Sequence, residues 1–251
     1  MKRLTIAALV TAAAGMGQQA IENWALPTGM NANQTLSVIE TLNQPVPNRP
    51  FSGAAVVHTT HTLEDGTHVN STSSTVLYRD KDGRRRTETE HYINISDPVA
   101  HASLTLWPDE HRATKQDIDG YVLPEAKLAT EAFSNGGQKA GKKRASGPTQ
   151  NVVRENLGTQ TVNGVLCYGG RSTVIIPVGA IGNDREIKAV KETWTSVDLH
   201  ILVKSTDSDP RFGTSTYDLT NITQAAPDAT LFRLDVPSGY DVKTVQRMQL
   251  H

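Results

Sequence analysis

The stretch Leu77–Tyr92, LYRDKDGRRRTETEHY, contains residue types that bind calcium ions or phosphate groups. Its acidic residues, beginning at Asp80, resemble the opening of a calcium loop. An EF-hand loop has glycine at its sixth position, oxygen ligands at the fifth and seventh, and a carboxylate at the twelfth. Counted from Asp80, the fifth and seventh positions are Arg84 and Arg86, and the twelfth is His91. We therefore predict that DKDG forms a turn and binds no calcium.

The three consecutive arginines of this stretch suggest a contact with nucleic acid. Side chains alternate along a strand, so Arg84 and Arg86 share one face with Glu88 and Glu90, and Arg85 lies on the other. The shared face is mixed in charge and typical of a solvated surface. The whole chain has a formal net charge of −1, and such a protein has no overall attraction for phosphate polymers. We predict no nucleic-acid partner.

Residues that could act in catalysis are scattered along the chain. His58 and His61 project to opposite faces of a strand, which does not suit one metal ion. The triplet Asp109–His111 is typical of a solvated turn. Cys167 lies in the apolar run NGVLCYGG, which predicts a packed thiol. It is the only cysteine of the chain, so an intramolecular disulfide is excluded. The chain has no G-x-S-x-G and no H-E-x-x-H pattern, so we predict no enzyme activity, no cofactor and no metal.

The segment Ser134–Pro148, SNGGQKAGKKRASGP, shares Gly136, Gly141 and Lys142 with phosphate-binding P-loops. Lys143 replaces the hydroxyl residue that would hold magnesium. A helical pattern precedes the segment where a strand is required, and a helix does not follow. We predict a flexible basic loop over residues 134–148 and no nucleotide binding.

The N-terminus has the pattern of a secretory signal peptide. The basic letters KR precede the uncharged apolar run 4–17, and small residues follow. A membrane-spanning helix needs about 20 apolar residues, and this run is shorter. We predict a signal peptide over residues 1–20, cleaved after Ala14 or Ala20, and a secreted or periplasmic protein with no transmembrane segment after cleavage. Its removal takes two positive charges away and changes the net charge from −1 to −3.

Turn signals at short intervals separate β-rich runs in most of the chain. AAVVHTTHTL, STSSTVLYR and RRRTETEHYINI form a predicted meander of three antiparallel strands, and similar runs continue through GTSTYDLTNIT. Short helices are predicted at Asn33–Leu42 and Pro124–Phe133. The predicted fold is mainly β, a large curved antiparallel sheet or unclosed β-barrel with one or two short helices.

This fold divides the chain into four parts. Residues 1–20 form the signal peptide, and 21–50 form an N-terminal segment with a short helix. Residues 51–243 form the antiparallel β domain, which contains the flexible basic loop. Residues 244–251 form a C-terminal tail.

Apolar residues at alternating strand positions mark the candidate binding faces. If a curved sheet turns such faces inward, they enclose either a ligand cavity or a core filled by the protein's own side chains. The predicted ligand-binding residues are Leu104, Leu106, Val190, Trp194, Leu199, Ile201 and Leu219.

The C-terminal half resembles a group of uncharacterised secreted bacterial proteins. The relevant letters are KETWTSVDLHILVKSTDSDPRFGTSTYDLTNI followed by PDATLFRLDVPSGYDV, within Val152–Val242. Their order is a Trp-bearing strand, a strand ending in a charged turn, a third strand, then LF and P-x-G-Y. More distantly, this part is similar to the periplasmic lipoprotein carriers LolA and LolB and to the sensor domain of RseB. The resemblance implies an unclosed antiparallel barrel around an apolar cavity, lidded by short helices.

Two functions fit these patterns. The first is a cell-envelope binding protein that holds a lipid, an acyl chain or a lipidated peptide, such as a lipoprotein, in the concavity of the sheet. The second is a non-enzymatic structural, interaction or sensor protein of the envelope, with a filled core and a protein partner. The depth and apolar lining of the concavity distinguish them.

Overall fold

The computed structural model describes residues 46–118 and 151–245. They form twelve strands and two short 3-10 helices, η2 (Pro108–Glu110) and η3 (Ala229–Phe232). The predicted signal peptide, both predicted helices and the predicted basic loop lie outside the described residues. The strands are β1 (Phe51–Thr62), β2 (His68–Arg79), β3 (Arg85–Glu88), β4 (Ile93–Asp97), β5 (Ala102–Trp107), β6 (Arg112–Asp117), β7 (Asn151–Val162), β8 (Val165–Ile176), β9 (Ile187–Ser196), β10 (Leu202–Asp209), β11 (Gly213–Thr223) and β12 (Asp241–Val245).

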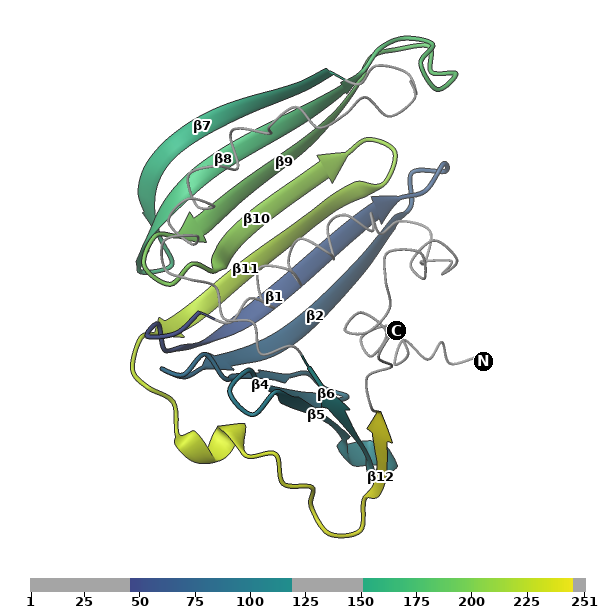
Figure 1. Cartoon of the computed structure of the whole chain (residues 1–251). Helices are drawn as coiled ribbons and strands as arrows, with labels where there is room; N and C mark the ends of the chain where they lie inside the picture. Colours follow the sequence, from purple (N-terminus) through teal and green to yellow (C-terminus); the bar gives the residue numbers. More distant parts are fainter. Residues whose placement is uncertain (1–45, 119–150, 246–251) are drawn as a thin grey trace, which may run out of the picture.

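All twelve strands belong to one sheet, in the order β12-β6-β5-β4-β3-β2-β1-β11-β10-β9-β8-β7. The pairs are antiparallel except β12 with β6, which is parallel. The two end strands do not pair with each other, so the sheet curves without closing (Figure 1). The predicted fold class, a mainly β protein with a curved, unclosed antiparallel sheet, is confirmed. No helix of the described residues has the length and apolar character needed to cross a membrane.

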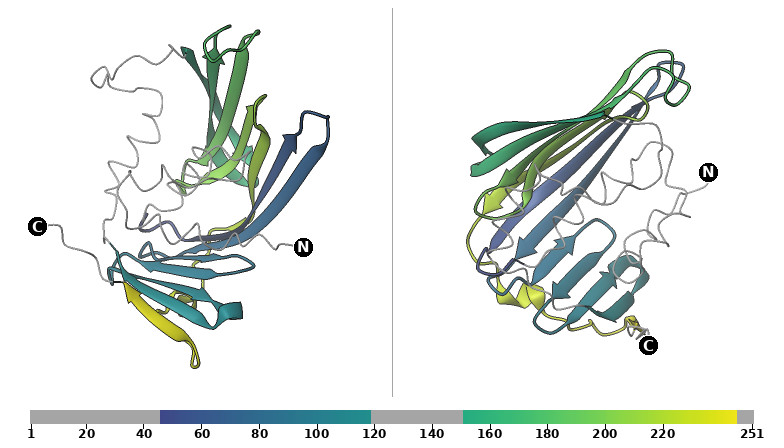
Figure 2. Two further views of the ribbon diagram at one scale, coloured as in Figure 1. Left: turned by 90° about the vertical axis from the view of Figure 1, so that its right-hand side faces the viewer. Right: turned by 45° about the horizontal axis from the view of Figure 1, so that its top comes forward.

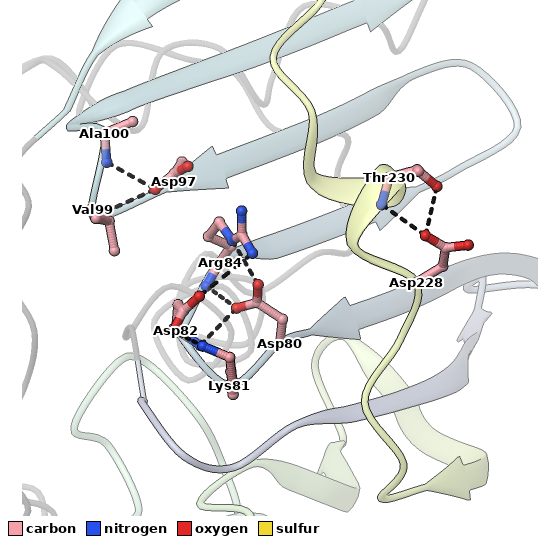
Figure 3. A network of polar contacts seen from close by, with 9 residues as sticks. All are labelled: Asp80, Lys81, Asp82, Arg84, Asp97, Val99, Ala100, Asp228 and Thr230. Carbon is pink, nitrogen blue, oxygen red and sulfur yellow. Dashed lines mark hydrogen bonds and ion pairs between the residues drawn. The ribbon is translucent and has the colours of Figure 1, made fainter.

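The turn predicted at DKDG connects β2 to β3. The Asp80 carboxylate accepts hydrogen bonds from the backbone amides of Asp82 and Arg84, both at 2.9 Å, and from the Arg84 side chain at 2.6 Å. Gly83 has a φ of 79°, which glycine adopts without strain. Figure 3 shows that Asp97, with the amides of Val99 and Ala100, and Asp228, with Thr230, organise two further turns in the same way.

One predicted strand is two strands in the structure. The run RRRTETEHYINI contains β3 and β4, which are separated by a tight turn. In that turn the Thr89 amide donates to the Tyr92 carbonyl at 2.9 Å, and the Thr89 hydroxyl accepts from the amides of His91 and Tyr92. A threonine hydroxyl that bonds to nearby backbone groups competes with strand pairing, which explains the difference.

The two faces of the sheet are named here after neighbouring residues of β1. The Ala55 face carries Ala55 and its cross-strand partners Leu219 and Thr75, and the Val56 face carries Val56 with its partners Asp218 and Ser74. The larger core cluster is centred on β1, β9, β10 and β11. Its buried members are Phe51, Ala55, Leu77, Val162, Val165, Cys167, Trp194, Leu199, Ile201, Leu202, Val203, Tyr217 and Leu219.

The C-terminal segment after β11 covers the Val56 face of β4–β6. Leu234, Val236 and Tyr240 pack on a second cluster of buried residues, Ile95, Leu104, Leu106 and Ala113. The side chain of Arg86 donates to the Leu231 carbonyl at 3.0 Å and so fixes η3. This segment runs along the outside of the bend in the sheet and leads into β12 (Figures 1 and 2). The Ala55 face therefore lines the inside of the bend.

Candidate functional site

The Ala55 face is uncharged over the middle of the sheet. Strand register places Tyr217 opposite both Val57 and Ser205, and Leu219 opposite Ala55. A Cβ atom added to Gly53 would lie 3.0 Å from Leu219 Cδ1, so this glycine lets the leucine lie against the strand. Most side chains on this part of the face are apolar, small or hydroxyl-bearing: Ala55, Val57, Thr59, Ser73, Thr75, Leu77, Ser205, Ser215, Tyr217 and Leu219. Asp207 of β10, opposite Ser215, is charged and forms an ion pair with Lys191 of β9 at 3.5 Å.

The Val56 face carries a row of charges across β7, β8 and β9. Arg171 lies 2.9 Å from Glu192 and 3.6 Å from Glu155, and the Trp194 indole N–H donates to Glu192 at 2.9 Å. The hydrogen bonds from Trp194 and Arg171 lower the pKa of Glu192 below its ordinary value. Arg171 offsets part of the charge of the two glutamates, and all three side chains are partly open to solvent. This face therefore has the character of an outer surface.

A pocket of 310 Å³ lies on the Val56 face, at the low end of the roughly 300–1,000 Å³ typical of ligand sites. Its lining includes the charged residues Lys204 and Asp218 and the imidazole of His58. The side-chain amide of Asn163, in the β7–β8 turn, donates to Asp218 at 2.6 Å and to the Leu219 carbonyl at 2.8 Å. The charges at this pocket suit a small polar molecule better than a hydrocarbon chain.

The Tyr217 hydroxyl is a buried polar group without a hydrogen-bond partner among the described residues. The residue is 3% exposed. Burial, followed by the charge of Asp218, raises the pKa of Tyr217 above its ordinary value, so the hydroxyl keeps its proton. Buried polar groups are nearly always paired, and an orphan therefore calls for a partner from outside the described chain. A ligand oxygen on the Ala55 face can supply one.

Arg79 marks one end of the Ala55 face. Its Nε donates to the Arg49 carbonyl at 2.8 Å, and its Nη2 donates to the Leu199 carbonyl at 2.6 Å. The guanidinium also lies 4.8 Å from the centre of the Phe51 ring. Burial, with the charges of Arg85 and Arg49, lowers the pKa of Arg79 to about 9. It still carries its proton at neutral pH.

The predicted ligand-binding residues fall into separate groups. Leu104 and Leu106 lie in the second cluster, beneath the C-terminal segment. The larger cluster contains Trp194, Leu199, Ile201 and Leu219. Val190 is half-buried, lies on the Val56 face on the same side of β9 as Trp194, and belongs to neither cluster. Contact of any of the seven with a ligand stays a prediction.

Sequence reasoning did not select Tyr217, Arg79 or Val57 as site residues. The alternating pattern that selected Leu219 also places Tyr217 on the same face, which was a usable signal. Arg79 ends the apolar alternation of STSSTVLYR, where an arginine is usually solvated. Val57 and its neighbours are small or hydroxyl-bearing, so hydrophobicity alone does not distinguish them.

No family model matches the chain, and no curated protein matches it. Several solved structures are similar to it. In the MucA/MucB complex of Pseudomonas aeruginosa, the match is 15% identical over 80% of this chain and 59% of the other, with a TM-score of 0.36. An uncharacterized conserved protein from Thermus thermophilus matches at 9% identity over 87% of this chain and all of the other, with a TM-score of 0.41. A LolA superfamily protein from Nitrosomonas europaea matches at 10% identity over 79% and 96%, with a TM-score of 0.24.

These similarities include proteins of the predicted LolA-like group. The chain spans 59% of the length of the matched chain in the MucA/MucB complex. Similarity at these identities does not extend to the chemistry of a site.

Proposed function

We propose that this protein is an exported, non-enzymatic binding protein of the cell envelope that holds a lipid, an acyl chain or a lipidated peptide on the Ala55 face of its sheet. The proposal includes export, because it keeps the predicted signal peptide. It also keeps the predicted domain boundaries. The observation that carries the proposal is the contrast between the faces. The Ala55 face is uncharged on β1 and β11 and on β2 as far as Leu77, and it lies inside the bend, with the ion pair of Asp207 and Lys191 on β10 and β9 beside it. The Val56 face carries the row of charges formed by Glu155, Arg171 and Glu192.

The energetics of hydrocarbon burial support such binding. Each buried methylene contributes about 0.8 kcal/mol, so ten methylenes contribute roughly 8 kcal/mol before ordering costs. No charged contact is needed for measurable affinity. The two end strands do not pair with each other, so barrel closure does not fix the width of the concavity.

A second function, an envelope structural, interaction or sensor protein with a filled core, is favoured by one part of the structure. Leu104 and Leu106 are buried by the chain's own residues Leu234, Val236 and Tyr240. In the half of the sheet formed by β4–β6, the Val56 face is thus closed by the protein itself. This second function predicts that the Ala55 face is equally occupied and takes no ligand.

A fluorescent fatty acid distinguishes the two functions. Val57 and Val56 are adjacent, identical in type and both half-buried, but they lie on opposite faces. Val57→Glu places a charge on the Ala55 face, and we expect it to weaken binding of the fluorescent fatty acid at least about tenfold, which corresponds to about 1.4 kcal/mol. Val56→Glu is the matched control and should leave affinity unchanged. Saturable binding that both variants weaken equally, or no binding by the wild-type protein, would contradict the proposal.

A further inference from the structure

Two arginines lie side by side at the end of the Ala55 face. Arg79 of β2 pairs with Arg85 of β3, which pairs in turn with Ser96 of β4, so the three side chains point to the same side of the sheet. Arg85 donates to the Ser96 hydroxyl at 3.2 Å. Arg79 is 2% exposed. Burial lowers the pKa of Arg85 to about 10, as it does for Arg79.

Arg79 differs from most other arginines of the described residues in its electrostatic environment. Six of them have a carboxylate oxygen within ion-pair distance, and in five of these pairs the acid is two or four residues away in the sequence. No carboxylate of the described residues comes within that distance of Arg79. Its described hydrogen bonds go to two neutral backbone carbonyls, and the adjacent charge of Arg85 is repulsive. A buried charge without an opposite charge is costly unless another anion compensates it.

The position of this pair fits the polar end of an amphiphile. Arg79 lies opposite Phe51, and Leu77, Ala55 and Val57 follow along the same face toward the middle of the sheet. Phe51 and Val57 are six residues apart, which is roughly 20 Å along a strand. A hydrocarbon chain lying along this line would place its head group at the guanidinium groups.

We propose that the ligand carries an acidic oxygen group, a carboxylate or a phosphate, and that Arg79 and Arg85 bind this group. The inference rests on the proposed function, because it supplies the head group of the molecule held on the Ala55 face. Guanidinium groups form strong, charge-assisted hydrogen bonds with both kinds of oxyanion. An anion beside Arg79 compensates its buried charge and offsets the repulsion that it experiences from Arg85.

Arg79 also has a structural role that the test must separate. It joins the backbone before β1, at Arg49, to the β9–β10 connection at Leu199. Substitution of Arg79 is therefore expected to destabilise the fold whether or not an anion binds. The primary experiment changes the ligand and leaves the protein intact.

The test is displacement of the fluorescent fatty acid from the wild-type protein by lauric acid, lauryl phosphate and lauryl alcohol, which share one hydrocarbon chain. We expect at least one of the two acidic ligands to bind about tenfold more tightly than the alcohol. The stronger of the two identifies a carboxylate or a phosphate as the natural head group. Equal displacement by all three ligands would overturn the head-group assignment and leave the proposed function standing. If none of them binds, the proposed function itself fails.

A variant pair then assigns the effect to this site. Arg85→Gln should reduce the preference for the acidic ligand over the alcohol to less than about threefold, with little change in affinity for the alcohol. Arg112→Gln is the control, because Arg112 stacks 3.7 Å from the Trp107 ring centre and pairs with Glu110 on the surface. Its preference should equal that of the wild-type protein. An unchanged preference in Arg85→Gln would contradict the assignment to this arginine pair.

Discussion

Removal of the Tyr217 hydroxyl should stabilise the ligand-free protein, which is the reverse of the usual effect. A buried tyrosine hydroxyl that is hydrogen-bonded contributes about 1 kcal/mol, and its deletion normally lowers stability by that amount. The Tyr217 hydroxyl is buried and has no partner among the described residues. Leaving such a group unsatisfied costs about 1–3 kcal/mol, and Tyr217→Phe removes the group together with its cost. The phenyl ring keeps the apolar contacts within the larger core cluster.

We expect Tyr217→Phe to raise the free energy of unfolding by about 1 kcal/mol, or the melting temperature by about 2–4 °C. Urea denaturation of delipidated protein measures the first quantity and calorimetry the second. Ser196→Ala is the opposing control, because the buried Ser196 hydroxyl accepts the Leu199 amide at 3.1 Å and its loss should cost about 1 kcal/mol. If Tyr217→Phe is destabilised as much as Ser196→Ala, the hydroxyl has a partner in the ligand-free protein and the reasoning is refuted.

Two further predictions concern the packing around β8. A Cβ added at Gly169 would lie 2.4 Å from Trp194 Cζ3, so Gly169→Ala should destabilise the protein by about 1–3 kcal/mol and shift its tryptophan fluorescence. A Cβ added at the neighbouring Gly170 would meet nothing closer than 4.0 Å, so Gly170→Ala should have neither effect. Cys167 is 0% exposed and burial raises its pKa to about 11, so a thiol reagent at pH 8 should label it only after unfolding in urea. Equal effects of the two glycine variants, or rapid labelling of the folded protein, would contradict this packing.

Local patterns in the sequence were enough to predict the strand-rich fold and one of its turns. The alternation in STSSTVLYR and the turn residues DKDG act over a few positions, and the structure forms β2 and the Asp80 turn there. The division of RRRTETEHYINI into two strands was missed. It depends on hydrogen bonds of one side chain, Thr89, which compete with an otherwise regular strand pattern.

The candidate site was harder to predict because it depends on pairing between distant strands. The uncharged middle of the Ala55 face exists because Val57 lies opposite Tyr217, which is far away in sequence. Leu104 and Leu106 looked equivalent to Leu219 by alternation, yet the C-terminal residues around Leu234 cover the first two. Burial by residues that are distant in the sequence produces no local hydrophobic pattern, so it could not be predicted from the sequence.

Mass spectrometry of the protein purified without detergent from its native envelope tests the central claim most directly. We predict a stoichiometric acyl-containing molecule that remains bound in the native spectrum and in Val56→Glu, and that is lost or strongly reduced in Val57→Glu. The proposed arginine site further predicts an acidic head group on that molecule. A folded wild-type protein that has the mass of the intact mature polypeptide and carries no lipid or lipidated peptide would contradict the account and favour a filled core.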